Sequence, residues 1–191
     1  WSGSDGSLIR EYSSSLNWDF FGSAICGVGD LNNDGFDDLA VGAHDDDWGS
    51  LGAGAAYVYS GMDGSTIHTL RGGHPWDRFG SAITSCGDMN QDGVPDFAVS
   101  SPRQKAGAKN AGKVVVFSGS TGQALFNMRG RGRNSFFGTR MVCLGDISGD
   151  GIPDLAISAL NDSTNILGLE AYLEIRSGSD GAVISTLEQE T

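Results

Sequence analysis

The stretch GDLNNDGFDDLAVGA at residues 29–43 decides the fold of this chain, because two further copies of it follow. GDMNQDGVPDFAVSS occupies residues 87–101, and GDISGDGIPDLAISA occupies residues 145–159. The first Asp of the stretch moves from Asp30 to Asp88 to Asp146, a step of 58 residues each time. Self-similarity at a fixed period of this size indicates a repeat protein in which each copy is one supersecondary unit.

Other short motifs keep the same step. A Phe-Gly pair lies at residues 21–22, 79–80 and 137–138, and we expect its Phe to belong to the core of each unit. A Ser-Gly pair lies at residues 2–3, 60–61 and 118–119. The next Ser-Gly pair, at residues 177–178, comes one residue late, so the third copy has a single insertion after its Asp-rich loop. The repeat therefore covers nearly the whole chain.

Each unit contains four candidate strands. In the first unit we expect them at residues 21–27, 38–43, 55–59 and 66–70, with residues 8–12 as the fourth strand of a preceding unit. The second is a short, continuous apolar run, which is typical of a strand buried on both faces. SGMDGS, between the third and the fourth, is a hairpin signal. These features predict an all-β fold of β-propeller blades, each with four antiparallel strands.

The repeat also predicts the domain organisation. Residues 1–191 form a single repeat domain, with residues 1–16 as the fourth strand of a preceding blade and blades at 17–74, 75–132 and 133–191. The chain thus has three complete blades plus an orphan N-terminal strand. Because propellers close with roughly four to eight blades, we expect these to be part of a larger propeller or of a ring closed by a homo-oligomer.

The composition narrows the possible partners. The chain has 191 residues, 30 of them Gly, and 39% are hydrophobic, which favours many short strands and tight turns over disorder. Its net charge of −12 argues against nucleic acid as a partner. No apolar run approaches the roughly 20 residues that span a bilayer, so we expect no membrane insertion. Cys26, Cys86 and Cys143 form no C-x-x-C pair, and we expect small buried residues there.

Oxygen-bearing residues recur at alternate positions of each Asp-rich loop. Ca²⁺ prefers about six to eight oxygen ligands, and a loop that curls round the ion turns alternate positions inward. Position 6 is Gly, which permits a sharp turn, and position 7 can offer only its backbone carbonyl. We therefore predict up to three Ca²⁺ ions, one per loop, held by Asp30, Asn32, Asp34, Phe36 and Asp38; by Asp88, Asn90, Asp92, Val94 and Asp96; and by Asp146, Ser148, Asp150, Ile152 and Asp154.

The alternatives to calcium are weaker. A single loop of this kind could be a polar turn, but three carboxylates recur in each of three loops and would repel one another without a cation. An EF-hand needs Glu at position 12, where this chain has Val41, Val99 and Ile157. Mg²⁺ demands stricter octahedral geometry. Occupancy of the third loop is open, because Ser148 is a poorer ligand than Asn.

These residues resemble the FG-GAP repeat family, which forms the blades of integrin α-subunit propellers. The matching elements are the Phe-Gly pair, the loop at residues 30–38 and the Val-Gly-Ala at residues 41–43, with their counterparts. The resemblance implies that each loop joins the first two strands of a blade and binds Ca²⁺ on one rim. It places ligand sites on the opposite rim. The Gly-Ala-Pro element departs from the family, reading GAH, SSP and SAL here.

Two sets of loops should form that opposite rim. One set covers residues 44–54, 102–112 and 160–170, and the other covers 13–19, 71–77 and 129–135. The first loop is acidic, at residues 45–47, whereas Arg103, Lys105 and Lys109 make the second basic. Charged loops often serve only solubility, and Trp76 repeats Trp18, which also fits packing between blades. Our candidate ligand-binding residues are Trp48, Trp76, Arg131 and Arg133.

We expect an extracellular or cell-envelope module that binds an unknown protein or carbohydrate, as in cell adhesion, and that is not an enzyme. The three His residues fall at non-equivalent positions, and no G-x-S-x-G nucleophile motif occurs. Loops of this kind fill readily at extracellular calcium, which supports the location. Two alternatives stay open: a non-catalytic propeller domain of a larger secreted enzyme, and a self-assembling structural module.

Overall fold

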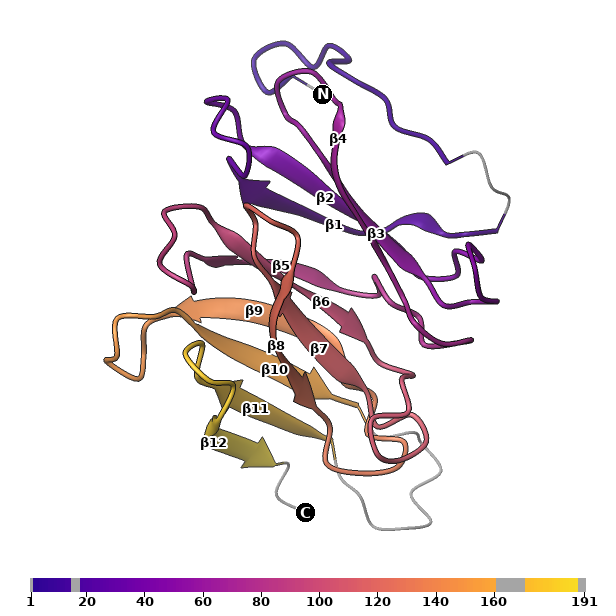
Figure 1. Ribbon diagram of the computed structural model, residues 1–191, viewed down its shortest axis with the longest axis vertical. Helices are drawn as coiled ribbons and strands as arrows, with labels where there is room; N and C mark the ends of the chain where they lie inside the picture. The colour runs from indigo at the N-terminus through magenta and orange to yellow at the C-terminus, as the bar shows by residue number, and fades with distance from the viewer. Residues whose placement is uncertain (1, 15–17, 161–170, 189–191) are drawn as a thin grey trace.

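Three four-stranded antiparallel sheets make up the chain (Figure 1). The computed structural model describes residues 2–14, 18–160 and 171–188. The first sheet contains β1 (Phe21–Gly29), β2 (Asp38–Ala43), β3 (Ala55–Tyr59) and β4 (Thr66–Arg71). The second contains β5 (Ile83–Gly87), β6 (Asp96–Ser101), β7 (Lys113–Phe117) and β8 (Ala124–Arg129). The third contains β9 (Phe137–Gly145), β10 (Asp154–Ala159), β11 (Tyr172–Arg176) and β12 (Val183–Glu188).

The sheets are the predicted blades of a partial β-propeller. Within each sheet the strands pair in sequence order, and every pairing is antiparallel. The sheets follow one another in chain order (Figure 1). β1 packs beside β5 and β5 beside β9, so the first strands of successive blades are neighbours. Among the described residues there is no helix that could span a membrane.

The N-terminal segment differs from its prediction. Residues 2–14 contain no assigned strand, although residues 8–12 were expected to form one. In the other blades a fourth strand pairs with a third strand, and by the 58-residue step Trp1 corresponds to Tyr59, the last residue of β3. Among the described residues, no third strand pairs with residues 8–12. Instead the Tyr12 ring packs against the Tyr59 ring, with centroids 4.6 Å apart.

The core lies between blades and not within them. Val28, Leu31 and Val58 of the first blade pack against Phe79 and Phe97 of the second. A second cluster joins the second and third blades in the same way, and it includes the equivalent Phe137. Each blade therefore has a forward face and a back face, and burial of both in the middle blade explains the continuous apolar run in β6.

Both outer blades leave one such face open. Ile147 of the third blade is 51% exposed, whereas its counterpart Leu31 is 3% exposed beneath the second blade. Leu144 and Leu187 are exposed on the same forward face. On the back face of the first blade, Ile25 is likewise exposed. These flanks are the surfaces that bury a neighbouring blade elsewhere in the chain, which agrees with a partial propeller.

The three cysteines lie on the first strands, Cys26 on β1, Cys86 on β5 and Cys143 on β9. All are free thiols. Cys86 is fully buried, and this burial raises the pKa of its thiol well above the ordinary value. Cys26 and Cys143 are half-buried. A buried thiol with a raised pKa is a poor nucleophile, which agrees with the predicted packing role of Cys86.

Candidate metal loops and the opposite rim

The first Asp of each loop accepts hydrogen bonds from backbone N–H groups later in the same loop. The Asp30 carboxylate accepts hydrogen bonds from the backbone N–H groups of Asp34 and Gly35, at 3.0 and 2.8 Å. The Asp88 carboxylate does the same with Asp92 and Gly93, at 3.0 and 2.8 Å. The Gly at position 6 has a φ of 90° in the first loop, a left-handed conformation that favours glycine. The predicted turn at position 6 is therefore confirmed.

The last Asp of each loop is buried and joins two segments. Asp38 accepts hydrogen bonds from the N–H of Leu31 at 2.8 Å and from the N–H of Gly61 at 3.0 Å. Gly61 lies in the hairpin between β3 and β4, so Asp38 ties that hairpin to the loop. Asp96 and Asp154 make the equivalent bonds in the other blades.

The repeated Ser-Gly pair is explained by the same contact, which sequence reasoning interpreted only as a turn signal. A Cβ on Gly61 would lie 2.0 Å from the carbonyl oxygen of Asp37. On Gly119 it would lie 1.8 Å from that of Pro95. Ser60 Oγ donates to Asp34 at 2.9 Å, and thereby adds a second tie. The sequence signal was present, since the pair keeps the 58-residue step, but its partner is distant in the chain.

Hydrogen bonding favours the ionised form of the middle Asp in every loop. Ser120, Asn90 and the N–H of Val94 lower the pKa of Asp92. The pKa of Asp34 is also lowered, because hydrogen bonds from Asn32, Ser60 and Phe36 outweigh desolvation. These carboxylates are therefore anionic and accessible in the first two loops, as a cation ligand must be.

The donor set fits a hard cation, but the side chains do not converge. The predicted ligands offer only oxygen atoms, and a carboxylate oxygen that accepts one hydrogen bond keeps a second lone pair. Within the described residues, however, no three Asp, Glu, His or Cys side chains are grouped to hold a metal. Both Asp38 oxygens accept N–H bonds, so a bidentate contact there would require one of those bonds to break. The ligand assignment stays a prediction.

The third loop keeps the backbone of the other two despite Ser148. Asp146 accepts hydrogen bonds from the N–H groups of Gly149 and Gly151, at 2.7 and 2.9 Å. Position 4 is left-handed in all three loops, with φ of 58° at Asn33, 60° at Gln91 and 82° at Gly149. Gly is the residue that adopts this conformation at least cost. The sequence change at position 3 therefore leaves the loop fold intact, and occupancy of the third loop stays open.

The opposite rim is held together by backbone hydrogen bonds between the two loop sets. The N–H groups of Trp76 and Phe79 donate to the carbonyls of Leu51 and Ala53, at 2.9 Å each. One blade later, Asn134 donates to Lys109 at 2.8 Å and Phe137 to Ala111 at 3.2 Å. The predicted loop at residues 160–170 lies mostly outside the described residues. The loops over the first two blades are therefore positioned by main-chain contacts that do not depend on their side chains.

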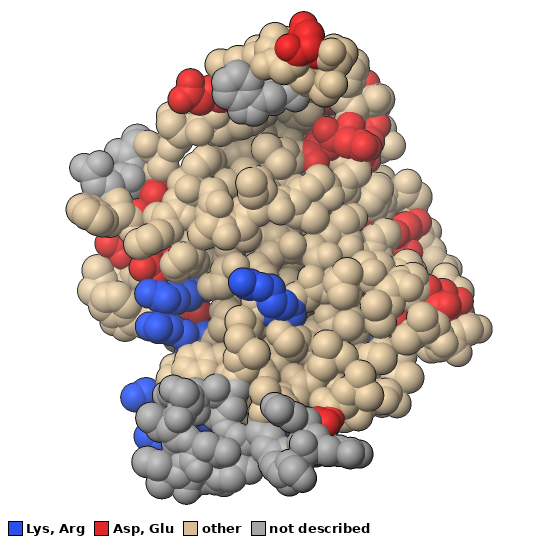
Figure 2. Space-filling view, turned by 180° about the vertical axis from the view of Figure 1, so that it is seen from behind, with Lys and Arg blue, Asp and Glu red and all other residues tan. Residues whose placement is uncertain are grey.

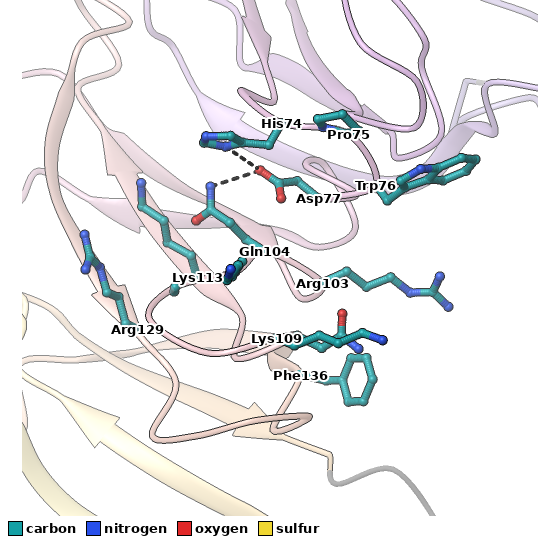
Figure 3. A pocket seen from close by; sticks show the side chains of 13 residues that line it. His74, Pro75, Trp76, Asp77, Arg103, Gln104, Lys109, Lys113, Arg129 and Phe136 are labelled. Atoms are coloured by element: carbon teal, nitrogen blue, oxygen red, sulfur yellow. Dashed lines mark hydrogen bonds and ion pairs between the residues drawn. The ribbon is translucent and has the colours of Figure 1, made fainter.

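A pocket of about 820 Å³ opens on this rim over the second blade (Figure 3). Five of the chain's 12 Lys and Arg residues line it: Arg103, Lys105, Lys109, Lys113 and Arg129. Figure 2 shows Lys and Arg gathered mainly toward the left of that view, with some acidic side chains close above them and others along the upper and right edges. The one acidic residue in the lining is Asp77.

Asp77 is buried at the base of the pocket and has two side-chain donors. Its carboxylate accepts hydrogen bonds from Gln104 Nε2 at 3.1 Å and from His74 Nδ1 at 3.3 Å (Figure 3). Trp76 and Phe136 also line the pocket, and Trp76 is 54% exposed. The site thus combines concentrated positive charge, fixed amides and an exposed aromatic ring.

The four candidate ligand-binding residues are dispersed. Trp76 lies at the pocket. Trp48 lies over the first blade, where the Arg71 guanidinium stacks 4.8 Å from the centre of its ring. Arg131 forms ion pairs with Glu174 at 2.6 Å and Glu188 at 2.7 Å.

Arg133 is exposed. The donors of Arg131 are thus engaged within the third blade, and its predicted contact with a ligand stays untested. Sequence reasoning missed Lys113, because it stands in no recognisable motif and only the strand pairing places it opposite Arg129.

Comparison with known proteins agrees with the repeat. The family model described as FG-GAP repeat matches residues 21–59 and 79–117. Integrin alpha-5 of Xenopus laevis is 33% identical over 181 residues, which cover 86% of this chain and 17% of the integrin. Human integrin alpha-6 is 33% identical over 161 residues, covering 78% of this chain and 13% of that protein. The chain therefore spans less than a fifth of these relatives.

Two solved structures share the fold. A rhamnogalacturonan lyase of Bacillus licheniformis superposes with a TM-score of 0.54 at 15% identity, covering 85% of this chain and 33% of the lyase. Rhamnogalacturonan lyase YesW gives a TM-score of 0.50 at 19% identity, with the same coverage of both chains. At these identities the similarity concerns the fold alone.

Proposed function

Because this chain is built of FG-GAP repeats like those of integrin α subunits, we propose that it is a calcium-stabilised propeller segment that binds a protein or glycan outside the cell or in the cell envelope. The supporting observation is a division between two rims. One rim carries three loops of carboxylate oxygens, with an amide in the first two and the Ser148 hydroxyl in the third, each tied to its blade by a buried Asp. The other carries loops fixed by main-chain hydrogen bonds around a pocket.

Calcium would be held by the oxygens of each Asp-rich loop, in the first loop by Asp30, Asn32 and Asp34, the Phe36 carbonyl and one oxygen of Asp38. When bound, it supplies positive charge that offsets the repulsion between the loop carboxylates. Two of these carboxylates already contact the β3–β4 hairpin through Ser60 and Gly61. A filled loop would therefore stabilise the outer half of the blade as well.

Thermal unfolding with calcium and with excess chelator tests this part of the proposal. A ligand that binds only the folded state adds about 2.7 kcal/mol of stability at a hundredfold excess over its Kd. We expect a higher Tm in calcium and a smaller rise in an Asp34→Asn, Asp92→Asn double variant. An equal Tm in both buffers, with no calcium by elemental analysis, would reduce the loops to acidic turns and remove the main support for an extracellular location.

The similarity to lyase structures supports one alternative, a non-catalytic propeller domain of a larger secreted enzyme. We propose that the chain itself has no catalytic activity. Incubation with rhamnogalacturonan and measurement of ultraviolet absorbance by unsaturated uronate products checks this directly. Product formation that persists in the purified chain would contradict our assignment as a binding module.

The open apolar flanks support another alternative, a module that assembles through its blade faces. Light scattering over a range of protein concentrations distinguishes this self-assembling module from a segment that does not self-associate. An oligomer that dissociates in an Ile147→Glu variant would favour assembly through the forward face of the third blade. A monomer at all concentrations would count against assembly through that face.

A further inference from the structure

We propose that the pocket over the second blade binds an acidic oligosaccharide, through charge-assisted hydrogen bonds to its carboxylate or sulfate groups. This inference rests on the proposed function, because it names the ligand class of a module that we propose to be a binding module. It concerns residues of the second blade only, and it is independent of the metal loops on the other rim.

Lys113 and Arg129 are directly opposite each other on paired strands, β7 and β8. Their side chains extend side by side toward the pocket (Figure 3). Like charges directly opposite in an antiparallel pair are destabilising. Within the described part of the chain, no carboxylate forms an ion pair with either residue. Such a pair is unfavourable for the sheet and favourable for an anion that lies between the two cations.

The equivalent pairs in the other blades have no such conflict. The first blade has Ala55 opposite Arg71, and the third has Tyr172 opposite Glu188. Arg71 stacks on the Trp48 ring, while Glu188 accepts a hydrogen bond from Arg131. The position is thus occupied by a like-charge pair in the second blade alone, so the pair is not a requirement of the blade fold.

Arg103 and Lys109 add positive charge from the loop between β6 and β7. Both are exposed, and in Figure 3 they extend side by side on the Trp76 side of the pocket, across from Lys113 and Arg129. The loop between them is fixed at both ends, since Gln104 donates through its N–H to Ser101 at 3.1 Å and Gly112 donates to Gln104 at 3.1 Å. These cations are therefore presented by an ordered loop, which reduces the entropy cost of binding.

The aromatic and amide groups favour a sugar over an acidic peptide. Trp76 is 54% exposed at the pocket. Its φ of 64° is left-handed, as it is at Trp18 and Asn134 of the other two blades, so this conformation belongs to the repeat backbone. A flat exposed indole ring can stack on the apolar face of a pyranose. The Gln104 amide, held by Asp77, offers hydrogen bonds at a fixed position for hydroxyl groups.

Calorimetric titration of the calcium-saturated chain with four probes tests the proposal. The probes are an oligogalacturonate, a heparin-derived oligosaccharide, a neutral galactan oligosaccharide and a Glu-rich peptide. We expect binding of at least one acidic oligosaccharide that weakens as salt is added, because salt screens exposed charges, and no binding of the neutral one. The first two probes distinguish a carboxylate from a sulfate ligand. Tighter binding of the peptide than of both acidic oligosaccharides would overturn the assignment to a glycan.

Substitutions locate the binding. We expect Lys113→Ala and Arg129→Ala each to weaken binding by about tenfold, the loss of one charge-assisted contact. Arg140→Ala is the matched control, because Arg140 is exposed and lies on β9 outside the pocket, and its guanidinium donates to the neighbouring Thr139 carbonyl. Equal weakening in the control would show general charge attraction and would overturn the pocket as the site.

The chain itself suggests a variant for the aromatic contact. The third blade has Asn134 at the position of Trp76, with a φ of 60°. Since Asn tolerates this conformation better than Trp, we expect Trp76→Asn to retain or raise the Tm while weakening glycan binding. Unchanged binding would contradict the stacking role. If no acidic oligosaccharide binds although calcium still raises the Tm, this inference fails while the calcium part of the proposed function stands.

Discussion

The rims of the first and second blades have the same backbone and opposite charge, and they use that charge differently. Over the first blade Asp45 pairs with Arg78 at 3.0 Å, and Asp46 accepts a hydrogen bond from the Tyr57 hydroxyl at 2.6 Å. Over the second blade, Arg103 and Lys105 take the places of Asp45 and Asp47 by the 58-residue step.

No described carboxylate pairs with either of these two cations. The acidic loop is therefore stabilised by its own contacts, while the basic loop presents its charge to the pocket. Charge density alone does not distinguish a binding surface from a self-contained loop. The two differ in whether the charged side chains are paired with other groups of the chain.

The largest expected effect concerns the close contact between the Ser-Gly pair and the Asp-rich loop, which both blades share. Gly119→Ala would place a Cβ 1.8 Å from the Pro95 carbonyl oxygen. We expect it to lower the free energy of unfolding by roughly 3 kcal/mol or more, measured by urea denaturation, because backbone must move to relieve the clash. Gly3→Ala is the control, since Gly3 has the same place in the repeat but no atom within 4 Å of the added Cβ. Similar losses in both variants would contradict the hairpin contact.

The next effect concerns the acidic loop of the first blade, whose carboxylates have partners within the chain. Tyr57→Phe removes the hydroxyl that donates to Asp46, which is 2% exposed. A buried acceptor that loses a partner costs about 1–3 kcal/mol, so we expect a loss in this range by urea denaturation. Val115, at the same place in the second blade, makes no such bond. No measurable loss would mean that the acidic loop is held by its backbone alone.

A smaller effect of opposite sign is expected in the second blade. Lys113→Ala removes one member of the like-charge pair with Arg129. Relief of a cross-strand repulsion is worth about 0.2–1 kcal/mol, so we expect equal or slightly greater stability in low salt, with the difference disappearing in high salt. Clear destabilisation in both buffers would show that Lys113 packs as a structural residue, and would weaken the contrast between the two rims.

The smallest effect concerns pH. His44 of the first blade is replaced by Pro102 in the second. Burial lowers the pKa of His44, despite the neighbouring Asp45 carboxylate. A His with a lowered folded pKa contributes stability above its unfolded pKa of about 6.5 and loses it as pH falls below that value. We expect His44→Asn to reduce the drop in Tm between pH 7 and pH 5.5. A larger drop in Tm in the variant would contradict a lowered pKa of His44 in the folded state.

Most of the fold could be predicted from the repeat. The predicted strands at residues 38–43 and 55–59 coincide with β2 and β3, because a short apolar run between turn signals leaves little freedom in its bounds. The orphan strand at residues 8–12 was wrong. Strand propensity could not show that no third strand pairs with these residues in the described part of the chain.

The site was less accessible to sequence reasoning. The Asp-rich loops stand out because their ligands are local, within nine consecutive residues. The bond from Gly61 to Asp38 spans 23 residues and the ion pair from Arg131 to Glu174 spans 43. Contacts at such separations are set by blade packing and strand register, which a single sequence does not encode in any local pattern.

The open flanks have a consequence for symmetry. The exposed forward face of the third blade, with Leu144 and Ile147, and the exposed back face of the first, with Ile25, are different surfaces. Copies that joined through them would associate head to tail, in heterologous contacts, and not about a twofold axis. Such contacts form a ring when the rotation between copies closes and an open filament when it does not. The angle between neighbouring blades would then decide whether self-association ends at a fixed size.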